Sequence, residues 1–137
     1  MLATTLSLYD EIRKEIDLID HFEIKTVNFD ECKKFYERVL LPLGIEVKWS
    51  DNTAAGFGKI NEGNVRFLIE KHDCCSKSHI AFSASSKLAV ENFYQAAIAA
   101  GYQCNGKPGL REMYAPNYYA AFVIDPDGNN IEAVIYL

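Results

Sequence analysis

Two histidines and one glutamate occupy positions from which they could bind one metal ion together. His21 and His79 lie 79 − 21 = 58 residues apart, and Glu132 interrupts the apolar run IEAVIYL at the C-terminus. An unpaired carboxylate is costly to bury, so Glu132 either faces water or meets a cation. Two neutral imidazoles and one carboxylate suit a divalent ion such as zinc, iron, nickel or manganese, with positions left open for water or substrate.

An internal repeat relates the two histidines. The segment HFEIKTVNFDECKKFYERVL from His21 aligns without a gap with HIAFSASSKLAVENFYQAAI from His79. Downstream, EGNVRFLIE from Glu62 resembles DGNNIEAVI from Asp127, with Gly63 opposite Gly128. The repeated unit is a strand, a helix and about three short strands. We therefore predict one α+β domain of two βαβββ modules, at about 18–71 and 78–137, related by a pseudo-two-fold axis.

Hydrophobic periodicity and turn residues locate the elements of this repeat. A helix predicted at about 5–17 precedes the repeat and has no counterpart in the second module. Two further helices are predicted at 30–41 and 86–100; Gly44 and Gly101 follow them, and Ser85 or Ser86 caps the second. The segment GKPGLREMYAPN, residues 106–117, is predicted to be an irregular insertion. Strands are expected near 21–27, 45–50, 54–60, 64–70, 79–84, 102–105, 118–125 and 130–136.

Strand alternation places the candidate ligands on one face of the sheets. Successive side chains of a strand point to opposite faces. In the last strand Ile131 and Ala133 belong to the apolar set that should cover a helix, so Glu132 points the other way. His21 and His79 likewise alternate with apolar residues of their own strands. The preceding DPDGN lacks the spaced acids of a calcium loop and is predicted to be a tight turn that aims Glu132.

At this point the chain resembles the vicinal-oxygen-chelate superfamily, which includes glyoxalase I, bleomycin-resistance proteins and extradiol dioxygenases. The resemblance runs from about 18 to 137 and is strongest with a branch of small bacterial glyoxalase-like proteins. It implies two βαβββ modules whose mixed sheet curls around a cleft, with His21, His79 and Glu132 as metal ligands. It also implies a homodimer, because this family often pairs its modules across subunits. The motifs that carry it are DHFEI, FYERVLLPLGI, HIAF, NGKPGLREMY and YYAAFVIDPDGNNIEAV.

One departure from the family pattern concerns a fourth ligand. Glyoxalase I has a further carboxylate on the strand that ends its first module. Pairing Gly63 with Gly128 places Phe67 at that position and predicts that Glu70 lies on the opposite face. Three protein ligands would then remain. This set resembles the two-histidine, one-carboxylate set of the dioxygenases more than the glyoxalase set.

Other residues are candidates for catalysis or substrate binding. Glu23 shares the face of His21 and could act as a base, although it could equally pair with Lys25 at a solvated rim. Tyr119 is a second catalytic candidate, which could donate a hydrogen bond. Arg111 could hold a carboxylate or phosphate in a fork, or form a structural ion pair. The segment HDCC, with Cys74 and Cys75, is either a small metal or redox site or an exposed linker. The remaining substrate-binding candidates are Tyr114, Tyr118, Phe67 and Trp49.

Composition limits the classes of partner. The 137-residue chain has a net charge of −5, which argues against nucleic acid and anionic membranes. With no apolar run long enough to span a membrane and acids where a signal peptide would be apolar, we expect a cytoplasmic protein. Three functions remain: a metal-dependent lyase, isomerase or dioxygenase acting on a small oxygen-chelating molecule, a metal-free binding protein of the bleomycin-resistance type, or a structural module with a vestigial site.

Overall fold

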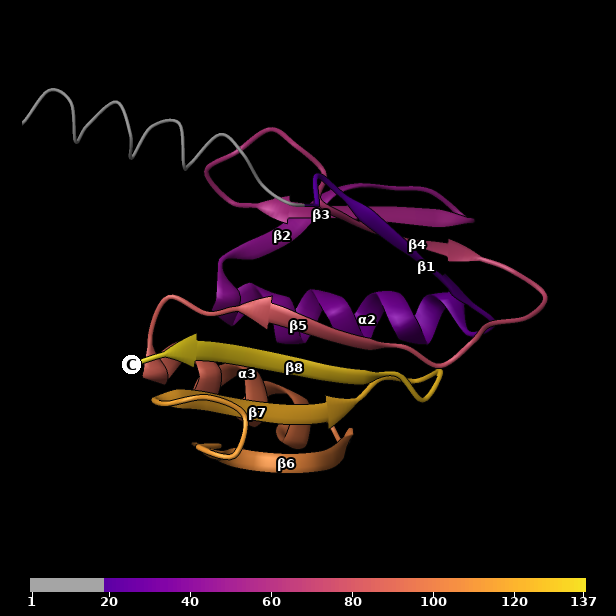
Figure 1. Cartoon of the computed structure of the whole chain (residues 1–137). Helices are drawn as coiled ribbons and strands as arrows, with labels where there is room; N and C mark the ends of the chain where they lie inside the picture. The colour runs from indigo at the N-terminus through magenta and orange to yellow at the C-terminus, as the bar shows by residue number, and fades with distance from the viewer. Residues whose placement is uncertain (1–18) are drawn as a thin grey trace, which may run out of the picture.

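The computed structural model describes residues 19–137, and the helix expected at about 5–17 lies outside the described residues. Residues 19–71 form a first module in which one helix links a first strand to three more (Figure 1). Its elements are β1 (Phe22–Thr26), α2 (Phe29–Leu40), the 3₁₀ turn η1 (Leu41–Leu43), β2 (Ile45–Ser50), β3 (Ala54–Lys59) and β4 (Phe67–Lys71).

The second module repeats this order and confirms the predicted duplication. One helix again links a first strand to three more. Its elements are β5 (His79–Ser83), α3 (Lys87–Ala99), β6 (Gln103–Leu110), β7 (Tyr118–Ile124) and β8 (Asn130–Tyr136).

Each module contains one four-stranded mixed sheet. The strand order is β1-β4-β3-β2 in the first sheet and β5-β8-β7-β6 in the second. In both sheets the first and last strands of the module pair in parallel, and the other pairs are antiparallel. A parallel pair needs a long crossover connection. In each module the helix and the two strands that follow it provide this connection.

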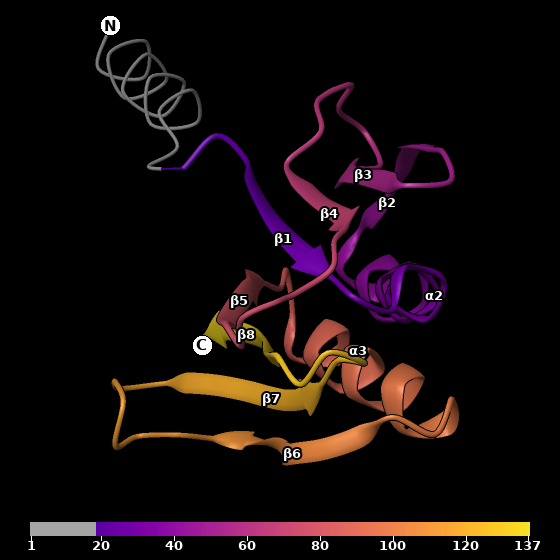
Figure 2. The same ribbon diagram turned by 90° about the vertical axis from the view of Figure 1, so that its right-hand side faces the viewer.

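The helices cover one face of each sheet and pack against each other. Figure 2 shows α2 and α3 on the same side of the two sheets. Ser86 caps α3: its hydroxyl accepts a hydrogen bond from the amide of Ala89 at 3.0 Å, so Ser86 is the cap of the two residues, Ser85 or Ser86, that the sequence predicts. Gly44 and Gly101 follow the helical segments with φ of +76° and +88°, which favours glycine. No helix within residues 19–137 has the length and apolarity needed to cross a membrane.

Aromatic side chains join the two modules in one core. The ring centroids of Phe35 on α2 and Tyr102 lie 4.7 Å apart. Those of Phe22 on β1 and Phe82 on β5 lie 6.1 Å apart. Phe67 is 1% exposed and packs against Phe22 at 4.8 Å. Pairs of this kind contribute about 0.5–1.5 kcal/mol beyond the area that they bury. The predicted helix-facing residues of β1, β5 and β8 all belong to this core or pack against it.

The DPDGN turn is organised by one buried carboxylate. Asp125 accepts hydrogen bonds from the amides of Asp127 and Asn129, from the side-chain amide of Asn129, and from the hydroxyl of Tyr36 at 2.6 Å. Asn129 in turn accepts a hydrogen bond from the amide of Ser78, the residue before β5. The turn therefore fixes the starts of β8 and β5 to each other and to α2 of the first module.

Two predictions about the strands are corrected by the structure. Residues 106–110 belong to β6 and not to an irregular insertion, because Pro108 and the glycines are tolerated in a bulged edge strand. The fourth-ligand position is Leu68, not Phe67, because Leu68 pairs with Glu23 as Glu132 pairs with Ala81.

This register also corrects the face assigned to Glu70. Glu70 lies two residues beyond Leu68 and so shares its face, away from α2. The error arose because the glycine alignment is out of phase by one residue. A one-residue shift moves every side chain of a strand to the other face.

We predict that Asp125→Ala lowers the free energy of unfolding by about 3–4 kcal/mol, because it leaves buried donors of three residues without an acceptor. Urea unfolding measures the change. Asp51→Ala is the matched control, since Asp51 organises an exposed turn through hydrogen bonds from Thr53 and Ala54. Water can replace Asp51, so that loss should be about 1 kcal/mol. Equal losses in the two variants would contradict the role given to Asp125.

Candidate functional site

Glu132 occupies the centre of the second sheet on the face away from α3, which we call the open face. It pairs with Ala81 of β5 on one side and with Phe122 of β7 on the other. Although no helix covers this face, Glu132 is only 1% exposed. A carboxylate buried in this way needs nearby groups that compensate its charge.

Two polar groups contact the carboxylate of Glu132. His79 Nε2 lies 2.8 Å from Oε1, and the hydroxyl of Tyr118 donates a hydrogen bond to Oε2. Burial, together with the hydrogen bond to Glu132, raises the pKa of Tyr118, so its hydroxyl stays protonated and remains a donor. The His79 side chain is 55% exposed, and one edge of this network is therefore open to solvent.

A pocket of about 420 Å³ lies over this network. It is lined by His79, Tyr114, Tyr118, Phe122, Asn130 and Glu132. All of these belong to the second module, whereas the sequence had predicted a cleft shared by both. Three of them, Tyr114, Phe122 and Asn130, also line a smaller hollow of about 160 Å³ that contains Arg111.

His21 lies elsewhere in the chain. It precedes β1, its side chain is 61% exposed, and its Nδ1 lies 2.7 Å from Asp20 Oδ1. The structure thus brings His79 and Glu132 together. Within residues 19–137 it forms no group of three close metal-ligating atoms that includes His21.

Glu23 also lies in the first module, on the face of β1 away from α2. A hydrogen bond with Glu70, more than burial, raises the pKa of Glu23. The side chain is exposed and is not part of the pocket over Glu132. Its neighbours identify it as half of a carboxyl pair, not as a partner of His79 within the same chain.

Three predicted residues lie away from the pocket. Tyr119 points toward α3, where its hydroxyl donates a hydrogen bond to Glu91 at 2.9 Å, because it is one residue out of phase with Tyr118. Phe67 is part of the aromatic core. Trp49 of β2 lies against Gly56 in the first sheet, where an added Cβ would meet its ring nitrogen at 2.7 Å.

A second group of metal-ligating atoms lies under the DPDGN turn and was missed from the sequence. Single ligand atoms of Cys32, Asp125 and Asp127 lie within 4.8 Å of one another, the only such trio found in residues 19–137. Asp125 already accepts four hydrogen bonds. Burial raises the pKa of Cys32, which disfavours the thiolate that a metal needs. We interpret this group as a structural joint, since Asp127 also accepts a hydrogen bond from the amide of Val27.

The residues of HDCC form no trio of close metal-ligating atoms within residues 19–137. Cys74 Sγ lies 3.8 Å from His72 Nδ1, whereas Cys75 Sγ lies 3.8 Å from Asp127 Oδ1. The partner of Cys74 lies within the segment itself, and that of Cys75 lies in the DPDGN turn. The segment is a linker that lines a hollow beside β1.

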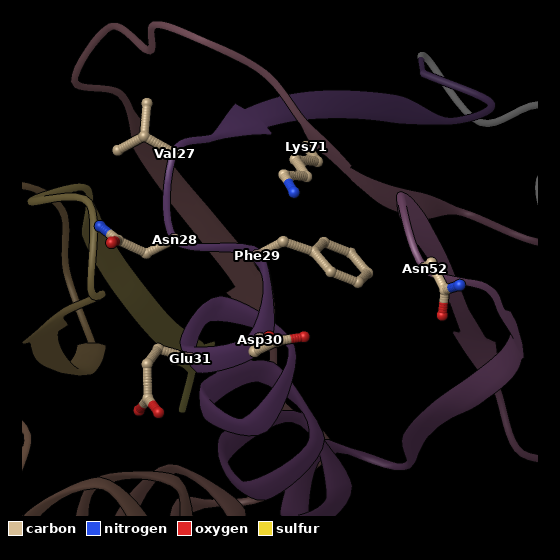
Figure 3. A pocket seen from close by; sticks show the side chains of 7 residues that line it. All are labelled: Val27, Asn28, Phe29, Asp30, Glu31, Asn52 and Lys71. Carbon is tan, nitrogen blue, oxygen red and sulfur yellow. The ribbon is translucent and has the colours of Figure 1, made fainter.

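A further hollow of about 350 Å³ lies at the start of α2 and is shown in Figure 3. Lys71 and Phe29 point into it, while Glu31 points away from Lys71. It contains neither histidine nor cysteine. Its side chains do not form a network like that of Glu132, so the open face of the second sheet is the stronger candidate site.

Comparisons with known proteins agree with the duplicated fold. The structure is similar to a glyoxalase/bleomycin resistance protein from Albidiferax ferrireducens, with 25% identity, a TM-score of 0.73, and coverage of 86% of this chain and 98% of that one. It also resembles a lactoylglutathione lyase from Agrobacterium tumefaciens, with 18% identity, a TM-score of 0.64, and coverage of 87% and 93%.

A third similar structure is a bleomycin resistance determinant encoded on the transposon Tn5. It has 18% identity, a TM-score of 0.56, and coverage of 82% of this chain and 92% of that one. A search of curated protein sequences found no match. The family model that matches residues 18–133 is described as the Glyoxalase/Bleomycin resistance protein/Dioxygenase superfamily. With its duplicated modules and this match over most of its length, the chain belongs to that superfamily.

Proposed function

We propose that the protein is a metal-dependent enzyme of the glyoxalase/dioxygenase type that acts on a small, oxygen-bearing substrate at the open face of the second sheet. The observation that carries the proposal is the buried carboxylate of Glu132, held by His79 on one oxygen and by Tyr118 on the other. A buried acid without a cation is costly, and sites with perturbed groups in a pocket are functional candidates.

The donor set fits a divalent ion only in part within one chain. His79 Nε2 and Glu132 Oε1 are an imidazole nitrogen and a carboxylate oxygen at 2.8 Å, on the wall of a pocket. Catalytic metal sites commonly use three protein ligands. His21 is the third donor in the proposal, and its exposed position makes it available to a second copy of the chain. We therefore infer a homodimer in which each site takes His79 and Glu132 from one subunit and His21 from the other.

In this proposal the residues of the chain orient the metal ligands and bind the substrate. A bound divalent ion would supply a Lewis acid that polarises a substrate oxygen. Tyr118 holds the carboxylate of Glu132 in one orientation through its hydroxyl, and Phe122 and Tyr114 line the pocket over the network. Glu23 lies on the same strand face as His21, so a subunit that supplies His21 also brings Glu23 as the candidate proton acceptor.

The alternative is a metal-free binding protein of the bleomycin-resistance type. The observation that favours it is that both oxygens of Glu132 already have partners in the protein. The aromatic rings of Tyr114, Tyr118 and Tyr136, whose successive centroids lie 5.4 and 5.2 Å apart, would then stack on the ligand. Under this alternative, thermal stability does not depend on added metal.

We predict that at least one of zinc, nickel, iron(II) and manganese stabilises the metal-depleted protein. The gain should be about 2.7 kcal/mol when free metal reaches about a hundred times its dissociation constant. His79→Ala and Glu132→Gln should each remove the gain, because each removes a ligand. His72→Ala is the control, since His72 lies in the linker. Thermal unfolding with and without each metal measures the effect, and no response to any of the four would contradict the metal proposal.

A mixing experiment tests the two-subunit site. We predict that His21→Ala and His79→Ala each lose metal binding alone, and that mixing the two after dissociation restores about a quarter of the sites. Half of the dimers are then mixed, and one of their two sites is intact. Metal content after chelation and dialysis measures the recovery. A mixture that binds no more metal than its components would exclude a site shared between subunits.

A further inference from the structure

The smaller hollow beside the pocket over Glu132 contains a positive charge without an acidic partner among residues 19–137. Arg111 follows β6, and its guanidinium lies over the ring of Phe122, with Cζ 5.6 Å from the ring centroid. None of the ion pairs found among residues 19–137 includes Arg111. The protein has a net charge of −5, so this guanidinium gives the hollow a charge opposite to that of the molecule as a whole.

The backbone holds this guanidinium in place. Its Nη2 donates a hydrogen bond to the carbonyl oxygen of Lys107 at 2.6 Å. Gly106 and Gly109 make room for it, because an added Cβ at these positions would lie 3.3 Å from Nη2 and 2.9 Å from Nη1. Arginine carries five N–H groups, so this arrangement leaves donors for two oxygens of a carboxylate or phosphate.

The hollow of Arg111 continues into the pocket over Glu132. The two share Tyr114, Phe122 and Asn130 as lining residues. Glu132, Phe122 and Gly106 are also successive partners across β8, β7 and β6. Neighbouring strands lie about 4.8 Å apart, so the backbone of Gly106, beside the guanidinium, lies roughly 10 Å from that of Glu132, with Phe122 between them.

We propose that Arg111 forms an anion subsite, and that the substrate is a small molecule with a carboxylate or phosphate at one end and a flat apolar body. The anion binds Arg111 in a fork, the flat body lies against Phe122, and the opposite end reaches His79 and Glu132. The amides of Asn105 and Asn130, hydrogen-bonded to each other at 3.0 Å, form a polar edge of the same hollow. The assignment of this molecule as substrate depends on the function proposed above, whereas the anion subsite does not.

The test is a binding titration of the full chain in the presence of a chelator. Benzoate and phenyl phosphate are the anionic probes, and benzamide and benzyl alcohol are the neutral controls of similar shape. Amide chemical shifts in NMR spectra report both the affinity and the location. We expect one or both anions to bind with shifts in β6 and β7, and each neutral control to bind at least about tenfold more weakly. Benzoate alone would assign a carboxylate, and phenyl phosphate alone would assign a phosphate.

Variants identify the residue responsible. Arg111→Gln should weaken anion binding at least about tenfold, and Arg111→Lys should recover only part of it, because lysine lacks the fork. Lys87→Gln is the matched control: Lys87 Nζ lies 5.0 Å from the ring centroid of Tyr119 on the opposite face of the same sheet, so its loss should leave binding unchanged. Circular dichroism verifies that each variant is folded.

Three results would overturn the subsite: equal binding of anions and neutral controls, unchanged binding by Arg111→Gln, or equal losses in Arg111→Gln and Lys87→Gln. Because the titration is free of metal, its failure would leave the metal proposal standing. Conversely, a protein that binds the anions but no metal would keep the subsite without the enzyme.

Discussion

The site depends on a buried carboxylate that takes no part in it. Asp125 is 4% exposed and accepts four hydrogen bonds, one of them from Tyr36 on the helix of the other module. Charge-assisted hydrogen bonds of this kind offset the cost of removing a carboxylate from water. Through Asn129 the same turn holds the amide of Ser78, beside His79. The strands that carry His79 and Glu132 are therefore fixed to each other at one end by protein contacts alone.

Asp125 and Glu132 differ in the kinds of group that donate hydrogen bonds to them. Asp125 uses both oxygens in contacts with backbone and neutral side-chain donors, which is the pattern of a structural group. Glu132 is as deeply buried, but its partners are an ionisable imidazole and a phenol on the wall of a pocket. Burial without saturation by the backbone is what makes the second acid a candidate for chemistry.

Much of the fold could be predicted from the sequence because the repeat and the strand period are strong local signals. Both modules, the caps at Ser86, Gly44 and Gly101, and the face of Glu132 followed from spacing alone. The sequence predicts too short a strand for β6, because proline and glycine usually indicate loops. An edge strand nevertheless tolerates them. Tyr119 was included beside Tyr118 although alternation places the two on opposite faces.

The position of His21 required information that no strand pattern contains. Alternation gives the face on which a side chain lies, but not how two sheets are placed relative to each other. The contact of Glu132 with Tyr118 was missed for a related reason, since it depends on the pairing of β7 with β8. The metal ligation by His21, His79 and Glu132 therefore stays a prediction.

The two modules differ at the position that Glu132 occupies in the second. Leu68 occupies in the first module the place that Glu132 occupies in the second. A leucine there requires no ionisable partner, so a substitution of Leu68 by another apolar residue leaves no buried charge unpaired. Only the second module therefore has to compensate a buried charge at this place in its sheet, and substitutions of Glu132 should be more restricted than substitutions of Leu68.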